Sequence, residues 1–372
     1  IIATIIIVEA IALPSSYKKL KQLAPIILSV ILSISVVCVL QIGVAQFSTS
    51  AKATYENSIV LAPNSPNVYF IIPDRMPSIA AQDEQGIATA DFVSALNNLG
   101  FYVNPTQMSH DTILPTSRGM STTRTLRYLC SVLNMGMDIS TSVAYNQASK
   151  LVKYHEVGQI FKANGYEYYH IGSWFSETNT NPEADSNFHF NSFNIMDYLY
   201  SNEFGLAVVD QSFLRYLTAA SILPHDTLFK VEYNRALAQY DAIVLASQQA
   251  GQKFVFAHIL MPHPPYVFNA DGTMQDNELT TQEQYYEQVK YAQRYLVNMA
   301  SDILKNDPTA IIAIQSDEGV AYTNPKLDYG LSMTQWNGVL SAWRIPEATQ
   351  SELSQLKHTD ILKYIVDGLN AQ

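Results

Sequence analysis

Cysteine and positive charge are both scarce in this chain of 372 residues. The two cysteines, Cys38 and Cys130, are too few for a disulfide scaffold or for a zinc site built from cysteines. Lysine and arginine number 22 against 33 aspartates and glutamates, so the net charge is −11 and no basic stripe is available for nucleic acid. Charged residues make up only 15% of the chain and hydrophobic residues 48%, which excludes an intrinsically disordered protein.

Charge is missing altogether from residues 23–47, a run of 25 residues near the start of the chain. A bilayer is crossed by about 20 apolar residues, so this run predicts a transmembrane helix. Residues 1–13 are apolar apart from Glu9, and we expect them to be the end of an earlier span. The chain begins with Ile1 rather than methionine, so we expect it to be a piece of a longer protein.

The connector 14–22 fixes the expected orientation of this membrane region, residues 1–47. It carries Lys18, Lys19 and Lys21, and loops rich in lysine stay in the cytoplasm. We therefore expect a linker over residues 48–66 and an extracytoplasmic domain over residues 67–372, held at the cell membrane and in contact with the lipid bilayer. Cleavage of the apolar run as a signal peptide is the less favoured alternative.

The expected outer part of the chain is acidic. Three of the 22 basic residues lie in the connector but only one of the 33 acidic residues, Glu9, precedes residue 48, so 19 basic residues stand against 32 acidic ones. An acidic domain that handles an anionic substrate needs a local source of positive charge. A bound metal ion is the simplest source.

Apolar runs that alternate with helical patterns predict an α/β fold, with a mostly parallel sheet sandwiched by helices. In such sheets ligands bind beyond the carboxyl ends of the strands. The expected strands cover residues 67–73, 166–171, 253–259, 310–315 and 340–345. The expected helices cover residues 89–99, 122–134, 156–163, 231–250, 281–305 and 359–369.

Acidic and imidazole side chains follow three of the expected strands. Asp74 follows the first strand, His258 and His263 accompany the end of the strand 253–259, and Asp317 and Glu318 follow the strand 310–315. A single acidic residue after a strand is usually a turn or a helix cap. Three such strand endings in one chain indicate a shared site instead, and we expect Asp74 and Asp317 at the same edge of the sheet, at the ends of adjacent or near-adjacent parallel strands.

Several segments, in this order and spacing, resemble membrane-anchored sulfatase-like proteins of the alkaline phosphatase superfamily. They are NVYFIIPD, LGFYVNP, TLRYLCSVLNM, YYHIGSW, KFVFAHILMPHPPYVFNADG and IIAIQSDEG, and they span residues 67–346. The segment that contains HPPY is the most specific of them. The resemblance extends to lipoteichoic acid synthases and phosphoethanolamine transferases, and it implies one divalent metal ion, a threonine nucleophile and an Asp-His pair after a late strand.

The resemblance implies that Asp74, Thr125, Asp317 and Glu318 hold the metal ion. Two positions depart from the family pattern: Arg75 stands where a glycine is usual, and Glu318 stands where many relatives have histidine. Glutamate can bind a hard cation, so the change favours Mn²⁺ or Mg²⁺ over Zn²⁺, or else the site is lost.

Thr125 is the nucleophile that the resemblance implies. The family pattern places a threonine nine residues before an asparagine, here Asn134. Ser121, Thr122 and Thr123 are close enough to remain alternatives. A threonine hydroxyl is a weak nucleophile at neutral pH, and a bound cation would activate it.

Three histidines have different expected roles. The resemblance makes His263 a second catalytic candidate, in contact with the substrate anion or the leaving group. His258 lies inside the end of its strand and is expected to be a core histidine, and His170 is expected to support the rim of the site. The C/S-x-P-x-R motif of type I sulfatases is not supplied by residues 113–118, so "sulfatase-like" describes the fold and not the substrate.

The sequence therefore predicts a membrane-anchored, metal-dependent hydrolase or transferase of phosphate or sulfate esters. Its substrate would be an anionic ester of an envelope lipid or glycan. The alternative is a non-catalytic sulfatase-like domain that binds an anionic envelope ligand.

Overall fold

The computed structural model describes residues 59–109, 121–138, 145–188, 190, 227–275, 279–322, 325–328 and 330–371. They belong to one compact unit, residues 55–372. The expected span 23–47, the region 1–47 that contains it and most of the linker 48–66 lie outside the described residues. None of the described helices combines the length and the apolar character that crossing a bilayer requires.

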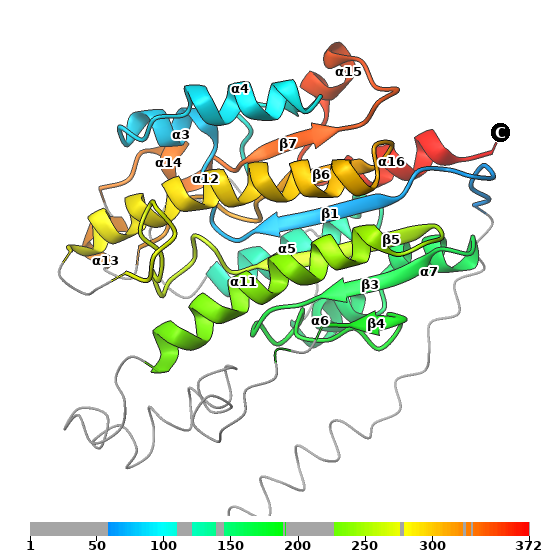
Figure 1. Cartoon of the computed structure of the whole chain (residues 1–372), viewed down its shortest axis with the longest axis horizontal. Coiled ribbons are helices and arrows are strands. Elements are labelled where there is room, and N and C mark those ends of the chain that lie inside the picture. Colours follow the sequence, from blue (N-terminus) through cyan, green and yellow to red (C-terminus); the bar gives the residue numbers. More distant parts are fainter. Residues whose placement is uncertain are drawn as a thin grey trace, which may run out of the picture. The chain divides into compact units, whose positions relative to one another are not determined.

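A seven-stranded sheet forms the centre of this unit, in the order β2-β7-β6-β1-β5-β3-β4 (Figure 1). Within it, β3, β4, β5, β1 and β6 run parallel, while β7 runs antiparallel to both β6 and β2. The predicted mostly parallel α/β sheet is therefore confirmed. The strands are β1 (Val68–Pro73), β2 (Tyr102–Val103), β3 (Glu167–Ile171), β4 (Ser186–Asn187), β5 (Lys253–Ile259), β6 (Ile311–Gln315) and β7 (Ser341–Arg344).

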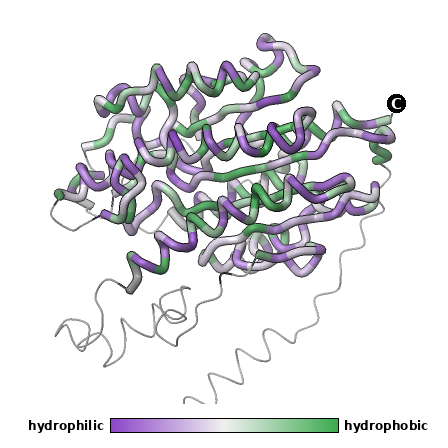
Figure 2. Tube along the Cα trace, in the orientation of Figure 1, coloured by the Kyte–Doolittle hydropathy of each residue, from purple (hydrophilic) through white to green (hydrophobic). Residues whose placement is uncertain are grey.

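Strand β1 shows why the central strands have no polar face. All six of its residues are buried, because helices cover the sheet on both sides. Successive side chains point to opposite faces, so Tyr69 and Ile71 join one hydrophobic core, while Val68, Phe70 and Ile72 join the other. Hydrophobic residues concentrate along these central strands in Figure 2, whereas the long helices mix hydrophobic and hydrophilic residues.

Two layers of helices complete the fold. Figure 1 shows α4, α12 and α11 across one face of the sheet and α5, α6 and α7 behind it. The first layer comprises α3 (Ile79–Glu84), α4 (Ala90–Asn98), α11 (Thr227–Gln248), α12 (Thr281–Asn306), α13 (Pro325–Asp328) and α14 (Met333–Asn337). The second comprises α5 (Ser121–Val132), α6 (Tyr145–Lys153), α7 (Glu156–Ala163), α15 (Gln350–Gln355) and α16 (Ile361–Leu369).

Helix α12, the longest in the described part of the chain, begins where its sequence predicts. Thr280 caps the helix by accepting a hydrogen bond from the backbone N–H of Glu283, whose side chain bonds back to the backbone of Thr280. Its buried face repeats at helical spacing through residues such as Val289, Leu296 and Ile303.

Candidate metal centre

Two carboxylates lie at the same edge of the sheet. Asp74 directly follows β1, and Asp317 lies two residues beyond the end of β6. Because β1 and β6 are adjacent and parallel, their carboxyl ends meet at one edge, as predicted. His258, near the end of β5, lies on the other side of β1, where it pairs in register with Ile72.

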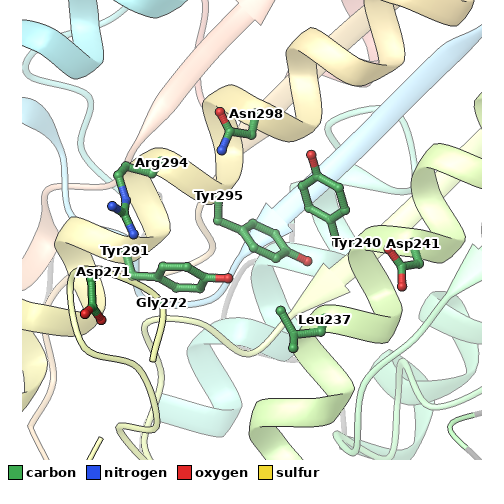
Figure 3. A pocket seen from close by; sticks show the side chains of 9 residues that line it. All are labelled: Leu237, Tyr240, Asp241, Asp271, Gly272, Tyr291, Arg294, Tyr295 and Asn298. Carbon is green, nitrogen blue, oxygen red and sulfur yellow. The ribbon is translucent and has the colours of Figure 1, made fainter. Parts of the chain in front are cut away.

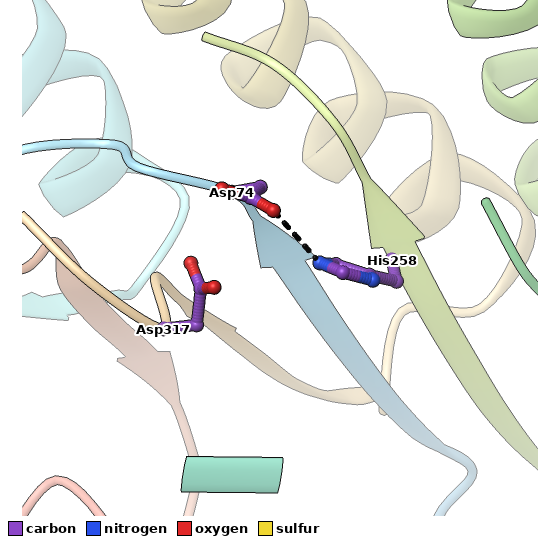
Figure 4. Close-up of side chains that lie close together, drawn as sticks. All are labelled: Asp74, His258 and Asp317. Atoms are coloured by element: carbon purple, nitrogen blue, oxygen red, sulfur yellow. Dashed lines mark ion pairs between the residues drawn. The ribbon is translucent and has the colours of Figure 1, made fainter. Parts of the chain in front are cut away.

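Asp74, His258 and Asp317 converge on one point (Figure 4). Each offers one ligand atom, and these atoms all lie within 4.8 Å of one another. Asp74 Oδ2 lies 3.4 Å from His258 Nε2. The three side chains are buried, and both Asp74 Oδ1 and His258 Nε2 have no hydrogen-bond partner among the described residues. Buried polar atoms that lack partners and share one point fit a divalent cation.

Thr125 lies against this group. It comes from the first helical turns of α5, and its Oγ1 donates a hydrogen bond of 2.5 Å to Asp317 Oδ2. The side chains of the alternative nucleophiles Ser121, Thr122 and Thr123 lie outside the described residues. The structure therefore brings Thr125 together with two of the predicted ligands, Asp74 and Asp317.

Glu318, the remaining predicted ligand, makes a different contact. Its Oε1 lies 2.8 Å from Arg75 Nε, which donates a hydrogen bond within a buried ion pair. The backbone N–H of Arg75 donates to Asp317 Oδ1 at 3.1 Å. Arg75 has φ 62°, in the left-handed region that glycine adopts most easily, so a strained backbone supports both contacts.

The carboxylates of the site repel one another. Burial, Asp74 and Glu318 together raise the pKa of Asp317 to about 7. Burial alone would also raise the pKa of Asp74, but His263, His258 and Arg75 lower it overall. A cation among these groups would relieve the repulsion.

His263 lies in the loop after β5 and beside Arg75. Its Nδ1–H donates to the carbonyl of Pro264, which leaves the Nε2 lone pair as an acceptor. The ring meets Trp174 edge-on at a centroid distance of 5.6 Å. Burial, followed by the charge of Arg75, lowers the pKa of His263 to about 4, so the imidazole is neutral at pH 7. A neutral ring can move a proton but offers no charge to an anion.

His258 is the site residue that sequence reasoning missed. It was expected to be a core histidine, and it is fully buried, yet its Nε2 faces the two aspartates. On the other side of the ring, Nδ1 lies 2.8 Å from Thr178 Oγ1. The available signal was a single imidazole near the end of a strand whose only other polar residue is Lys253 at its start. A Cβ on Gly172 would lie 1.9 Å from the carbonyl oxygen of Thr178, so only glycine allows this close approach.

A buried hydrogen-bond chain continues beyond Thr178. His170 Nε2–H donates to the Thr178 carbonyl at 2.8 Å, and its Nδ1 accepts from the Tyr168 hydroxyl at 3.1 Å. The Tyr168 oxygen lies 2.9 Å from His155 Nε2, while His155 Nδ1 accepts from the backbone N–H of Gly158 and so caps α7. His170 thus supports the rim of the site indirectly, through the backbone of Thr178.

A separate cavity of about 650 Å³ lies between α11 and α12 (Figure 3). None of its lining residues belongs to the group around Asp74. Arg294 is accompanied there by Asp241 and Asp271, so this cavity offers no excess of positive charge to an anionic ester. The lining residues are Leu237, Tyr240, Asp241, Asp271, Gly272, Tyr291, Arg294, Tyr295 and Asn298.

No protein-family model and no curated protein matches the chain. Among solved structures, it is similar to the integral membrane protein lipooligosaccharide phosphoethanolamine transferase A (EptA) from Neisseria meningitidis, with 12% identity and a TM-score of 0.49 over 84% of this chain and 56% of that one. This chain therefore spans little more than half of the length of EptA.

Two further similarities are of the same kind. The C-terminal periplasmic domain of EcEptC from Escherichia coli gives 12% identity and a TM-score of 0.49 over 84% of this chain and 85% of that one. The lipoteichoic acid synthase LtaP from Listeria monocytogenes gives 10% identity and a TM-score of 0.44 over 78% and 70%.

Proposed function

We propose that the domain is a metal-dependent hydrolase or transferase of phosphate or sulfate esters, with Thr125 as its nucleophile. The observation that carries the proposal is the hydrogen bond between Thr125 and Asp317. It lies beside Asp74 Oδ1 and His258 Nε2, which have no hydrogen-bond partner among the described residues. Asp74, His258 and Asp317 would hold one divalent cation, with the Thr125 hydroxyl next to it. Two carboxylates and one imidazole suit Mn²⁺ or Zn²⁺ better than Mg²⁺, which prefers oxygen ligands.

The bound cation would supply a Lewis acid that stabilises the threonine alkoxide and polarises an oxygen of the ester. Thr125 Oγ1 attacks the phosphorus or sulfur atom, and the bond to the leaving oxygen breaks. The hydroxyl proton ends on the leaving group, and His263, with its free Nε2 lone pair, is the side chain that we propose passes it on. Water or an acceptor hydroxyl then attacks the phosphorus or sulfur atom, and the bond to Thr125 Oγ1 breaks. The group leaves as the inorganic anion or as the ester of the acceptor, and the proton of the attacking hydroxyl returns to Thr125 Oγ1.

The substrate class follows from the expected position of the domain. We propose that residues 1–47 hold it at the outer surface of the cell membrane, where it meets anionic esters of envelope lipid or glycan. The span 23–47 and the three lysines of the connector support this placement.

The proposal is tested by the hydrolysis of nitrophenyl phosphate and nitrophenyl sulfate. The full chain in detergent should be inactive after chelation and should regain activity with Mn²⁺ or Zn²⁺. A protein that binds the cation but turns over neither ester, nor transfers from a lipid donor, would favour the non-catalytic alternative. The ion pair between Arg75 and Glu318 supports this alternative, because both residues depart from the family pattern and they bind each other.

A further inference from the structure

Arg75 and Glu318 form a built-in ion pair beside the candidate metal ligands. Their side chains are 13% and 3% exposed, and Arg75 Nε lies 2.8 Å from Glu318 Oε1. Arg75 also donates from Nη1 to the carbonyl of Ala321 at 3.3 Å, and its backbone N–H holds Asp317 Oδ1. The two side-chain contacts hold the guanidinium against the segment that follows β6, and its Nε also lies 3.8 Å from Asp74 Oδ1.

The charged side chains around the candidate metal site have a net charge of −2 when all are ionised. Asp74, Asp317 and Glu318 contribute three negative charges when ionised, and Arg75 contributes one positive charge. The net charge is therefore that of two carboxylates, which one divalent cation balances. A buried carboxylate needs a partner of opposite charge, and Glu318 has Arg75 within hydrogen-bond distance.

Among the described residues, the group whose ligand atoms lie close enough together to hold a metal ion contains Asp74, His258 and Asp317 but not Glu318. Catalytic metal sites keep a coordination position open for water or substrate, and a fourth protein ligand such as the Glu318 carboxylate would fill that position. The ion pair with Arg75 occupies the Glu318 carboxylate and thereby affects whether the cation receives three or four protein ligands.

We infer that Arg75 holds Glu318 out of the coordination shell and so sets both the affinity and the openness of the metal site. This inference rests on the proposed function, because it assumes that the site binds a divalent cation. Without Arg75, Glu318 would become a fourth protein ligand. The cation would then be bound more tightly, with fewer exchangeable water ligands.

The test is a double-mutant cycle with the variants Arg75→Gly, Glu318→Gln and the combination of the two. Glycine is the right replacement because position 75 has φ 62°, which glycine adopts without strain. The full chain in detergent is stripped with a chelator and titrated with Mn²⁺ by calorimetry. Water-proton relaxation then reports how many exchangeable waters remain on the bound Mn²⁺, and circular dichroism of the metal-free proteins checks the fold.

The variant Arg75→Gly should bind Mn²⁺ about tenfold more tightly and show a lower relaxivity per bound ion, since Glu318 displaces a water. The double variant should return to within about threefold of the parent, because a neutral pair that supplies no ligand has been removed. A double variant that binds about tenfold more weakly would overturn the inference, since Glu318 would then be a ligand in the parent. Equal affinity in Arg75→Gly and the double variant would overturn it too, because Glu318 would not reach the ion.

The parent protein separates failure of the inference from failure of the proposed function. If the parent binds Mn²⁺ with one site and only the cycle gives the wrong pattern, the metal centre stands and the role of Arg75 is wrong. If the parent binds no Mn²⁺ or Zn²⁺, the metal centre itself is wrong and the inference falls with it.

Discussion

Thr178 and His258 are joined by a buried hydrogen bond of 2.8 Å between Oγ1 and Nδ1. This contact occupies the nitrogen of His258 that faces away from the two aspartates and leaves Nε2 directed at them. A hydrogen bond to the ring nitrogen that does not face the metal fixes the orientation of a metal-binding imidazole, and its loss commonly weakens metal affinity by about 10- to 100-fold.

Replacement of this hydroxyl should therefore weaken metal binding without unfolding the domain. Thr178→Val keeps the volume of a side chain that is 1% exposed but removes its hydrogen-bonding oxygen. We expect the Kd for Mn²⁺ to rise about tenfold by calorimetry. Thr106→Val, at an exposed position, is the matched control and should bind as the parent does. Equal affinities for the two variants would show that Thr178 does not orient His258.

Acid should destabilise the domain through the buried histidines of the same hydrogen-bond chain. Burial, with the neighbouring His170, lowers the pKa of His155 to about 3, and burial lowers the pKa of His170 to about 4. In the unfolded chain both titrate near pH 6.5, so the unfolded state takes up more protons as the pH falls below 6.5. Each histidine should lower the free energy of unfolding by about 2 kcal/mol between pH 8 and pH 5.

Chemical denaturation at a series of pH values measures this slope. His155→Asn keeps a residue that can cap α7 but removes one titrating group, so its stability should fall less steeply between pH 6.5 and pH 4.5. A slope identical to that of the parent would mean that His155 is not held neutral in the folded state.

Removal of the metal should lower the melting temperature. Three buried carboxylates, Asp74, Asp317 and Glu318, share this edge of the sheet with one guanidinium. A cation whose free concentration is 100 times its Kd stabilises a folded protein by about 2.7 kcal/mol. In a domain of this size, that raises the melting temperature by roughly 5 °C. Chelation should remove this stabilisation and Mn²⁺ should restore it, except in Asp317→Ala. A melting temperature that neither treatment moves would refute the metal assignment whatever the nucleophile is.

The expected membrane orientation can be tested on whole cells. Because Lys18, Lys19 and Lys21 precede the apolar run 23–47, protease added outside intact cells should cut the chain after residue 47, in the linker 48–66 or the domain 67–372. A cytoplasmic protein should survive the same treatment as the control. Cleavage only after lysis would mean that the orientation is reversed.

The sequence was sufficient to predict the parallel core of the fold because the buried strands are apolar on both faces. The strand 253–259 and the helix 156–163 were predicted with the bounds that the structure has. The two-residue strands β2 and β4 were not predicted, because segments so short carry no periodicity. The antiparallel direction of β7 also depends on tertiary contacts that no local pattern records.

The candidate site was predictable only in part. Asp74 and Asp317 follow strands whose ends the sequence marks clearly. His258 was not distinguishable from a core histidine, since both are buried within an apolar strand. Arg75, which contacts Glu318, has a left-handed backbone, a conformation that arginine rarely adopts. No sequence pattern predicts this conformation, so the contact was not predictable.

Turnover by the Thr125→Ala variant tests the central claim most directly. A hydroxyl is the weakest of the proposed ligands, so this variant should keep most of its stabilisation by Mn²⁺, which calorimetry and melting curves verify first. Its hydrolysis of the best nitrophenyl ester should nevertheless fall on the order of 10³-fold or more, because the covalent threonine ester can no longer form. A metal-loaded Thr125→Ala protein as active as the parent would contradict the account and move the search for a nucleophile to Ser121, Thr122 and Thr123.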